Sequence, residues 1–321
     1  MFDMSINRKL DTAGANQEKL SIGPNFESEQ VVNYLSKLPI DIVLEGETGT
    51  GKDKLAMLIH RKSGRSGRFI AIHCAALPEA IAESELFGAN AGAFTGARVS
   101  RSGLIESSHN GTLYLDEIDS MSLFLQAKLL RVLDQRTVMR LGSTEAKTLN
   151  LRVITSTKKP LSQLVRQGTF RQDLFYRLSA VELHVLPLRE NRACIPPMFC
   201  RFVEQFSQKV SSDVPEISGG VRCQLVQYSW PGNVRELRFC AERFVIGLPI
   251  FSQGRGQEVR TLKQQMIEHE KNIIKASVDI NQGEIDTVAK DLGLPKRTLY
   301  YKINKLNILP KLSSDKEDVK S

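Results

Sequence analysis

The chain has 321 residues, of which 41% are hydrophobic and 25% charged, and this composition is typical of a globular protein with two or three domains. Its formal net charge of +8 favours a polyanionic partner such as nucleic acid. No CxxC pair occurs among the five cysteines and no run approaches about 18 apolar residues, so the sequence predicts reduced thiols in a cytoplasmic protein with neither a zinc motif nor a membrane span.

The pattern along the chain changes several times. Residues 1–20 are polar and mixed in charge, and we expect a disordered arm. Short apolar runs then alternate with helical patterns, which indicates a parallel α/β sheet. The runs interpreted as buried strands are 40–46, 68–73, 111–117 and 151–157, and a helix is predicted over 124–135. The expected divisions are an α/β subdomain (21–187), a helical subdomain (188–247), a linker (248–260), further helices (261–310) and a disordered tail (311–321).

The sequence GETGTGKD, residues 46–53, follows a predicted strand and opens a predicted helix, as a P-loop does. Its glycines allow backbone N–H groups to point at phosphate oxygens, and Lys52 can reach the β- and γ-phosphates. Asp53 stands where a serine or threonine usually binds Mg²⁺, and a glycine-rich turn without a ligand is the alternative interpretation. The residues assigned here to nucleotide binding are Gly46, Glu47, Thr48, Gly49, Thr50, Gly51, Lys52 and Asp53.

The hydrophobic run TLYLDEI, residues 112–118, ends in two acids. Carboxylates at the end of a buried strand are costly unless they meet a cation or hydrogen-bond donors. Next to a P-loop, Asp116 would orient Mg²⁺ and Glu117 would polarise the attacking water. Two acids that simply enter solvent as the strand ends are the alternative.

Three arginines fit a phosphate chemistry that needs additional positive charge. Arg171 and Arg177 lie six residues apart in GTFRQDLFYRL, about 600° along a helix and so roughly 120° from eclipsed, and need not bind the same group. Either could complete the site of a neighbouring subunit as an arginine finger. Arg235 follows the Pro-Gly turn of WPGNVREL at a predicted helix start. For each arginine alone, a surface salt bridge is the alternative.

Residues 92–97, GAFTGA, fit neither a helix nor a strand period and carry no charge. Together with the P-loop, CAALPEAIAESELFG, GTLYLDEID, GTFRQDLFYRL and WPGNVREL, this segment resembles the AAA+ bacterial enhancer-binding proteins that activate sigma-54 RNA polymerase. The resemblance covers roughly residues 21–247 and the C-terminal helices. The short stretch before the P-loop makes the chain most similar to the HrpS type, which turns on type III secretion genes in plant-associated bacteria.

The resemblance implies an ATPase that uses ATP and Mg²⁺, the latter held by Asp116 and Asp53, and that remodels the closed promoter complex. Lys52 would bind phosphate, Thr157 would be a sensor residue and Arg235 the sensor arginine. The loop that contacts the sigma factor would comprise Gly92, Ala93, Phe94, Thr95, Gly96 and Ala97. The family also implies self-association as a ring, which is expected to be a hexamer. Whether a second, paralogous activator also contributes subunits to this ring is left open.

Two positions depart from the family pattern. His73 stands where members usually have the asparagine thought to hold the catalytic glutamate in an inactive pose. We expect His73 to bond Glu117 as a switch, and a histidine without a switching role is the alternative. Lys158 stands where the family often has asparagine after Thr157, and the effect of that lysine is left open.

The segment 283–308 predicts a helix-turn-helix of the Fis-like kind that ends such activators. One apolar stripe comprises Ile285, Val288, Ala289 and Leu292, Gly293 ends that helix, and Pro295 starts the next. The second helix is basic, and a basic helix in a protein-docking bundle is the alternative. The expected contacts to upstream enhancer DNA are Lys296, Arg297, Thr298, Tyr301 and Lys302.

The P-loop begins at residue 46, too early for a preceding sensor domain of about 100 residues. We therefore expect regulation by expression level or by a separate protein, such as a paired activator or an anti-activator, and no membrane partner. Two other classes stay open: an AAA+ chaperone or unfoldase, which should lack a basic helix-turn-helix, and a DNA-binding repressor with a degenerate nucleotide site, which would not turn over ATP.

Overall fold

In a computed structural model of the chain, the described residues are 20–24, 30–95, 97–251, 267, 270–271, 273–275, 277–278, 281 and 284–306. The expected tail lies outside them, as does the expected arm apart from Leu20. The chain divides into two compact units, Met1–Phe251 and Ser252–Ser321, and each is described by itself. Among the described residues, no helix is both long and apolar enough to cross a bilayer.

The first unit is built on a six-stranded parallel sheet in the order β1-β10-β2-β9-β6-β3. Its strands are β1 (Leu20–Ile22), β2 (Ile42–Glu45), β3 (Phe69–His73), β6 (Thr112–Asp116), β9 (Arg152–Thr157) and β10 (Glu182–Val185). The four predicted strands are present. β1 and β10 were not predicted, because LSI and ELHV contain two apolar residues each and form no continuous apolar run. β3 was expected to be buried, but it lies at the sheet edge and His73 is exposed.

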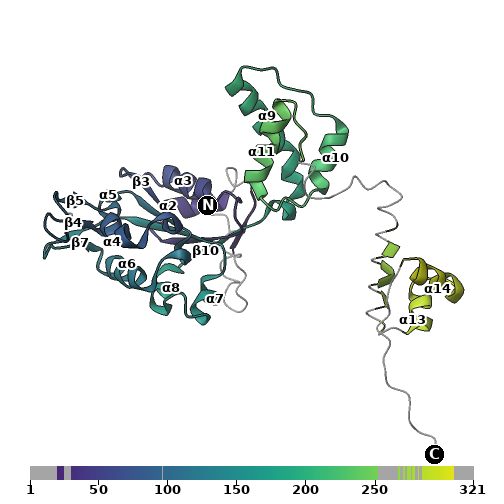
Figure 1. Cartoon of the computed structure of the whole chain (residues 1–321), viewed down its shortest axis with the longest axis horizontal. Helices are drawn as coiled ribbons and strands as arrows, with labels where there is room; N and C mark the ends of the chain where they lie inside the picture. The colour runs from purple at the N-terminus through teal and green to yellow at the C-terminus, as the bar shows by residue number, and fades with distance from the viewer. Residues whose placement is uncertain are drawn as a thin grey trace, which may run out of the picture. The chain divides into compact units, whose positions relative to one another are not determined.

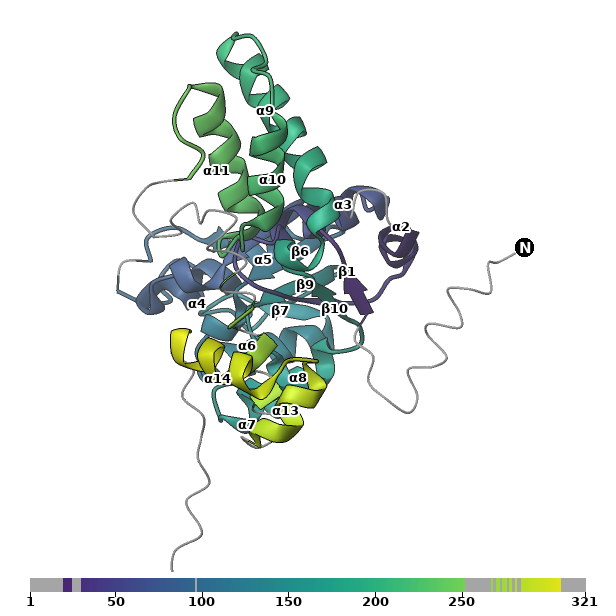
Figure 2. The ribbon, with the colours of Figure 1, turned by 90° about the vertical axis from the view of Figure 1, so that its right-hand side faces the viewer.

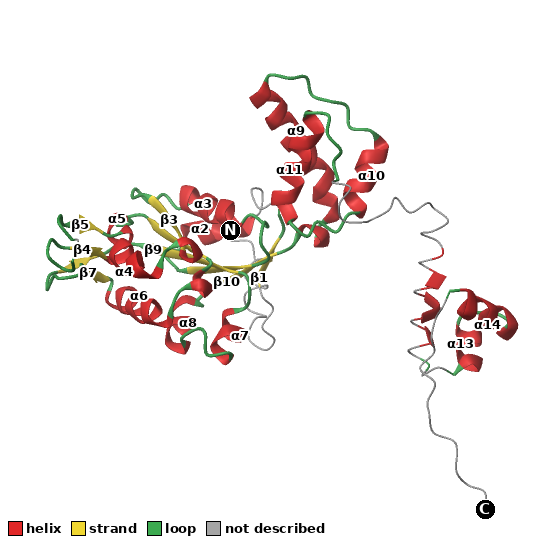
Figure 3. Ribbon diagram, viewed as in Figure 1, coloured by secondary structure: helices red, strands yellow, loops and turns green. Residues whose placement is uncertain are grey.

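Helices cover both faces of this sheet (Figures 1 and 3). One face packs against α2 (Gln30–Lys37) and α3 (Lys52–Lys62). The other packs against α4 (Glu79–Phe87), α5 (Leu104–Ser107), α6 (Leu123–Gln135), α7 (Leu161–Arg166) and α8 (Gln172–Leu178). Coverage on both sides explains why every residue of β2 and β9 is buried. Short 3₁₀ turns occur at Cys74–Ala76, Ile118–Ser120, Leu188–Glu190 and Arg192–Cys194.

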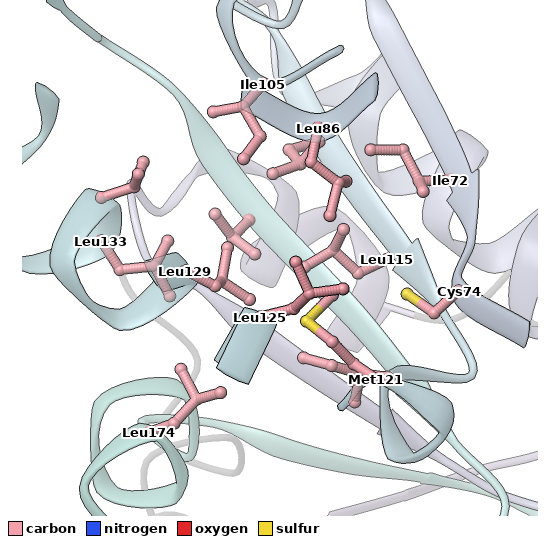
Figure 4. Packing of buried hydrophobic residues seen from close by; sticks show 14 of the residues in the cluster. Ile72, Cys74, Leu86, Ile105, Leu115, Met121, Leu125, Leu129, Leu133 and Leu174 are labelled. Carbon is pink, nitrogen blue, oxygen red and sulfur yellow. The ribbon is translucent and has the colours of Figure 1, made fainter. Parts of the chain in front are cut away.

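The larger core cluster shows how the helical spacing fills the sheet face (Figure 4). Leu125, Leu129 and Leu133 recur every four residues along α6, so they share one face of that helix. They pack with Leu115 of β6 and Leu174 of α8 in a cluster from which water is excluded. Truncation of such a leucine to alanine lowers the free energy of unfolding by about 2–5 kcal/mol. The cluster therefore stabilises β6, the strand that carries the two acids.

Two short antiparallel hairpins extend from the sheet domain. β4 (Gly88–Ala89) pairs with β5 (Arg101–Ser102) around the segment 90–100, and β7 (Thr137–Met139) pairs with β8 (Ala146–Thr148). Their bases are joined, since the N–H of Asn90 donates to the carbonyl of Leu141 at 2.9 Å and the N–H of Leu141 donates to Gly88 at 2.9 Å.

Three helices form a separate bundle in the first unit: α9 (Ile195–Val210), α10 (Gly219–Gln227) and α11 (Asn233–Val245) (Figures 1 and 2). Trp230 is fully buried in its core, and the indole N–H donates to the carbonyl of Leu225 at 2.8 Å. Two residues expected in the linker belong to this core instead, because Ile250 and Phe251 pack on it, with the Phe251 ring 4.7 Å from that of Tyr228.

The second unit contains α13 (Ile285–Asp291) and α14 (Lys296–Lys305), and helical residues lie between 267 and 278. The turn between α13 and α14 contains Gly293 at φ +62°, a conformation that favours glycine. The predicted stripe of α13 contributes to the core, in which Val288 packs with Leu299 and Ile303 of α14 and with Ile274.

Candidate active site

The glycine-rich loop connects β2, inside the sheet, to the N-terminus of α3, as the sequence predicts. Gly49 has φ +81°, and a Cβ there would come within 2.4 Å of the carbonyl oxygen of Gly232. The carbonyl of Gly49 accepts a hydrogen bond of 3.2 Å from the N–H of Arg235. Only glycine fits this close approach, so the loop is held directly against the first turn of α11.

Lys52 is 8% exposed, and its amine donates to the carbonyls of Gly46 at 2.7 Å and Glu47 at 2.9 Å. Burial lowers the pKa of Lys52, while the nearby charges of Asp116 and Glu117 oppose that shift. The structure therefore brings the predicted phosphate-binding lysine and the two predicted acids into one electrostatic environment. Asp53 is exposed in the first turn of α3.

Glu47, within the loop, is bound by the helical subdomain. Arg189 donates to both carboxylate oxygens at 2.6 and 2.8 Å, and the side-chain amide of Asn233 donates to Glu47 at 3.2 Å and to the carbonyl of Thr48 at 3.1 Å. The hydrogen bonds from Arg189 are the main reason that the pKa of Glu47 falls to about 2. The sequence placed Glu47 in the loop but did not identify Arg189 or Asn233 as its partners.

Asp116 ends β6 in a half-buried position where several donors meet. Its Oδ1 accepts hydrogen bonds from the hydroxyls of Ser156, at 2.5 Å, and Tyr114, at 3.0 Å. Nδ1 of His73 lies 3.2 Å from Oδ2. Burial by itself would raise the pKa of Asp116, but these hydrogen bonds and the charges of His73 and Lys52 hold it below its usual range. The acid is thus kept as a carboxylate.

Glu117 follows in a left-handed backbone conformation, φ +54° and ψ +52°. Its N–H donates to the hydroxyl of Ser156 at 3.0 Å, and Oε1 forms an ion pair of 2.8 Å with the amine of Lys158. A non-glycine residue in this region stores of the order of 1 kcal/mol or more, and such strain clusters at functional sites. Ser156 therefore orients both acids, although the sequence did not identify it.

The predicted switch and sensor residues have other contacts than expected. His73 lies against Asp116 and not against Glu117, since the register of β3 on β6 pairs His73 with Asp116. The hydroxyl of Thr157 bonds to the carbonyl of Lys159 at 2.7 Å, while its own carbonyl accepts the N–H of Gly46 at 3.2 Å. Thr157 thus supports the P-loop through its backbone, and its chain neighbours Ser156 and Lys158 contact the acids through their side chains.

The three arginines lie in different surroundings. Arg171 precedes α8, is exposed, and pairs through two nitrogens with Asp173 at 2.7 and 3.1 Å. Arg177 donates to Asp41 at 3.2 Å and to the carbonyl of Leu133 at 2.9 Å. Different partners agree with their spacing of six residues. Arg235 is exposed beside the P-loop in the first turn of α11.

The segment 90–100 stands away from the phosphate-binding loop, on the β4–β5 hairpin. Its described residues are ordered by turn hydrogen bonds, such as that from the N–H of Ala97 to the carbonyl of Phe94 at 3.0 Å. Gly92 has φ +80°, Thr95 is exposed, and Phe94 is 46% exposed. Gly96 lies outside the described residues. The aromatic side chain is thus presented to solvent.

In the second unit, the predicted DNA-contact residues do not all share one face. Lys296, Arg297 and Tyr301 are exposed and Thr298 is partly exposed. Lys302 forms an ion pair with Glu270, and Lys296 forms one of 2.6 Å with Asp286. Lys305, which was not predicted, is exposed with its amine 5.4 Å from the centre of the Tyr301 ring.

Three features of the first unit belong together: a P-loop between a parallel strand and a helix, paired acids on β6, and a helical bundle that contacts the loop. Together they define an ATPase core of the AAA+ class with its lid. The comparisons agree. Residues 25–184 match the family model "Sigma-54 interaction domain", and residues 189–276 match "AAA+ ATPase lid domain".

Relatives place the chain more narrowly. It is 49% identical over 280 residues to the "Pathogenicity locus probable regulatory protein WtsA" of Pantoea stewartii subsp. stewartii, with 87% of each chain covered. It is 46% identical over 281 residues to the "Pathogenicity locus probable regulatory protein HrpS" of Pseudomonas syringae pv. syringae, covering 87% of this chain and 93% of that one. The structure of NtrX from Brucella abortus in complex with ATP matches with a TM-score of 0.64 and 28% identity, over 95% of this chain and 73% of that chain.

The chain belongs to the sigma-54-dependent transcriptional activators of the AAA+ class, and within them it is of the HrpS type. The resemblance drawn from the sequence is confirmed. A regulatory role in transcription, a partnership with sigma-54 and a nucleotide-binding core follow from this membership.

Proposed function

We propose that the protein hydrolyses ATP at the P-loop and uses the energy to convert closed sigma-54 RNA polymerase complexes into open ones, at promoters of type III secretion and pathogenicity genes. The observation that carries the proposal is the connection between site and loop. The segment 90–100 leaves the core after α4 and returns through α5 into β6, which ends in Asp116. A rearrangement at the acids can therefore reach Phe94 along one continuous stretch of chain.

The residues present fit a nucleotide and Mg²⁺. Gly49 and Gly51 have φ values of +81° and +94°, as a loop that turns backbone N–H groups towards phosphate requires, and the buried amine of Lys52 donates to the carbonyls of Gly46 and Glu47. Asp116, held as a carboxylate, has the oxygen chemistry that Mg²⁺ prefers, with Asp53 as the second acid of the site. Bound Mg²⁺–ATP would supply the γ-phosphoryl group for transfer to water.

In this site, Lys52 and Arg235 would bind phosphate charge, Asp116 would orient the metal, and Glu117 would take the proton of the attacking water. Purified protein, sigma-54 polymerase and ATP on a supercoiled template should give open complexes detectable by permanganate footprinting. Lys52→Ala should abolish both ATP turnover and opening. Opening by that variant at the rate of the native protein would contradict the proposal.

The loop around Phe94 is proposed to contact the sigma factor. Its exposed aromatic ring and the absence of charge suit an apolar protein target. Thr95→Ala should keep ATP turnover within about twofold and lower transcription at least about tenfold, because coupling and not chemistry is removed. If that variant lost ATPase activity while binding sigma-54 normally, the coupling role would be wrong.

Ring formation is proposed to complete the site with an arginine from a neighbouring subunit. Arg171 pairs with Asp173, which is itself exposed, whereas Arg177 would have to leave the buried Asp41, so Arg171 is the better candidate finger. Native mass measurement of the ATP-bound assembly decides whether the ring is a hexamer. The same measurement with and without a paralogous activator or an anti-activator decides whether either partner joins the ring.

We further propose that the C-terminal unit is a helix-turn-helix that binds upstream enhancer DNA through α14. Arg297, Tyr301 and Lys305 are exposed at a spacing of four residues and so share one helix face. Arg297→Ala should weaken DNA binding. It should also reduce the slope of the logarithm of the binding constant against the logarithm of the salt concentration by about one, which corresponds to the loss of one phosphate contact. Lys290→Ala, which changes an exposed lysine on α13, is the matched control. Equal loss in both variants would argue against α14 as the contact helix.

A further inference from the structure

Lys158 is the residue whose effect the sequence left open, and the structure places it on the catalytic acid. Its amine lies 2.8 Å from Oε1 of Glu117. The two residues follow the carboxyl ends of neighbouring parallel strands, β9 and β6, so the sheet itself brings them together. The Glu117 side chain is 19% exposed and that of Lys158 is 43% exposed, which means that the ion pair covers the acid from the solvent side.

The other basic side chains described around the acids have different partners. Lys52 donates to the carbonyls of Gly46 and Glu47. His73 lies against Asp116. Restraint of Glu117 by a basic side chain therefore comes from the turn after β9 and not from β3.

An ammonium group in this position opposes the role proposed for Glu117. The carboxylate oxygen that the amine engages is not available to accept a proton from a water. The strained backbone of Glu117 and its N–H bond to Ser156 fix the start of the side chain, so the remaining freedom lies in the side-chain torsions that the ion pair controls.

We propose that Lys158 is a positioning residue that holds Glu117 in a resting pose, and that ATP turnover requires this ion pair to open. The inference rests on the proposed ATPase function and adds the element that restrains it. Nucleotide and the engaged target would favour the state in which Lys158 has released the carboxylate.

Kinetics of Lys158→Met test the proposal. The variant should raise basal kcat about two- to fivefold, the range available to a partly exposed ion pair, with KM for ATP changed less than about twofold. Lys158→Arg should restore the native rate, because it keeps the charge. Lys159→Met, the exposed neighbouring lysine, is the matched control and should leave both constants unchanged. A fall in kcat or a several-fold rise in KM for Lys158→Met would overturn the proposal, since the lysine would then bind phosphate.

A second measurement does not depend on turnover. A zero-length carbodiimide should join Glu117 to Lys158 in nucleotide-free protein, and Mg²⁺ with ADP and aluminium fluoride should suppress the cross-linked peptide in mass spectra. A cross-link that is absent, or that persists equally with the analogue, would contradict the proposal. If the native protein turned over no more ATP than Lys52→Ala, the proposed function would fail, and the response of the cross-link to nucleotide would then decide the role of Lys158 separately.

Discussion

At the scale of single residues, each group near the site has a partner that suits its chemistry. Asp116 is kept ionised by hydroxyl donors, and Glu117 forms an ion pair with the ammonium group of Lys158. Cys74 nearby is different, because burial, with the charge of Asp116 next in importance, raises the pKa of its thiol to about 12. That thiol stays protonated and unreactive near neutral pH. No disulfide joins the five cysteines in the structure.

The contact between His73 and Asp116 predicts an effect on metal binding. His73→Ala should raise the Mg²⁺ concentration needed for half-maximal nucleotide binding by about tenfold. The reason is that Asp116, the proposed metal ligand, loses a partner that orients it, which lowers the affinity of the site for Mg²⁺. Fluorescent-nucleotide binding titrated with Mg²⁺ measures this, and His109→Ala, at a distant surface position, is the control. An altered Glu117–Lys158 cross-link with unchanged Mg²⁺ dependence would show instead that His73 acts on Glu117.

At the scale of elements, the P-loop and the lid are joined through Glu47, Arg189 and Asn233. Asn233 has φ +52° at the start of α11, and its side-chain oxygen accepts the N–H of Leu188 at 2.8 Å while its amide donates to the P-loop. One side chain thus connects the start of the helical subdomain at Leu188, the first turn of α11 and the P-loop. Movement of the lid is thereby tied to the shape of the P-loop.

Removal of this connection should change nucleotide affinity in a non-additive way. Glu47→Gln and Arg189→Met each remove the same ion pair, so the double variant should weaken ATP binding little more than either single one. Isothermal titration with ATP measures the cycle, and Arg192→Met in the following 3₁₀ turn is the control. Additive losses would show that the two side chains act on nucleotide independently.

The hairpin β7–β8 is tied to α5 by a charge cluster. Arg140 donates to both oxygens of Glu106 at 2.8 Å, and Lys147 donates at 2.7 Å. The hydrogen bonds from Arg140 are the main reason that the pKa of Glu106 falls from 4.5 to about 2. Since Leu141 bonds to the base of the segment 90–100, this cluster also supports the loop that carries Phe94.

Glu106→Gln should therefore destabilise the fold in a pH-dependent way. The folded-state pKa is lower than the ordinary value, so the contribution of Glu106 is complete above about pH 4.5 and is lost as the pH falls towards 2. The variant should unfold about 1–2 kcal/mol more easily at pH 6, and the difference should shrink at pH 3. Urea denaturation at both pH values measures it. Glu145→Gln, exposed in the same hairpin, should show no such difference.

At the scale of the whole molecule, the chain separates the ATPase core and lid from the C-terminal unit. The boundary lies after Phe251, because Ile250 and Phe251 belong to the lid core. A truncated chain that ends at Phe251 should keep ATP turnover and lose DNA binding. A chain that ends at Gly247 lacks Phe251 and so loses its ring contacts with Tyr228 and Trp230. The free energy of unfolding of that shorter chain should be lower by about 1–3 kcal/mol. Thermal unfolding compares the two, and equal stability would mean that residues 248–251 are linker after all.

Much of this protein could be predicted from the sequence because local rules govern those parts. The strand–loop–helix order around Lys52 requires glycines in the loop, and the apolar runs mark the central strands whether or not their neighbours are known. The acids at the end of β6 and the two C-terminal helices follow from the same kind of local pattern. The family resemblance rested on these segments, and the comparisons confirm it.

The sequence could not decide which side chains meet across the sheet. The register of β3 on β6 sets His73 against Asp116, and the neighbouring ends of β6 and β9 set Lys158 against Glu117. Likewise, the packing of the lid decides that Arg189 and Asn233 hold Glu47, and the position of Glu270 decides that Lys302 is engaged. These pairs lie far apart in the chain, so their chemistry depends on strand register and helix packing, which only the tertiary structure determines.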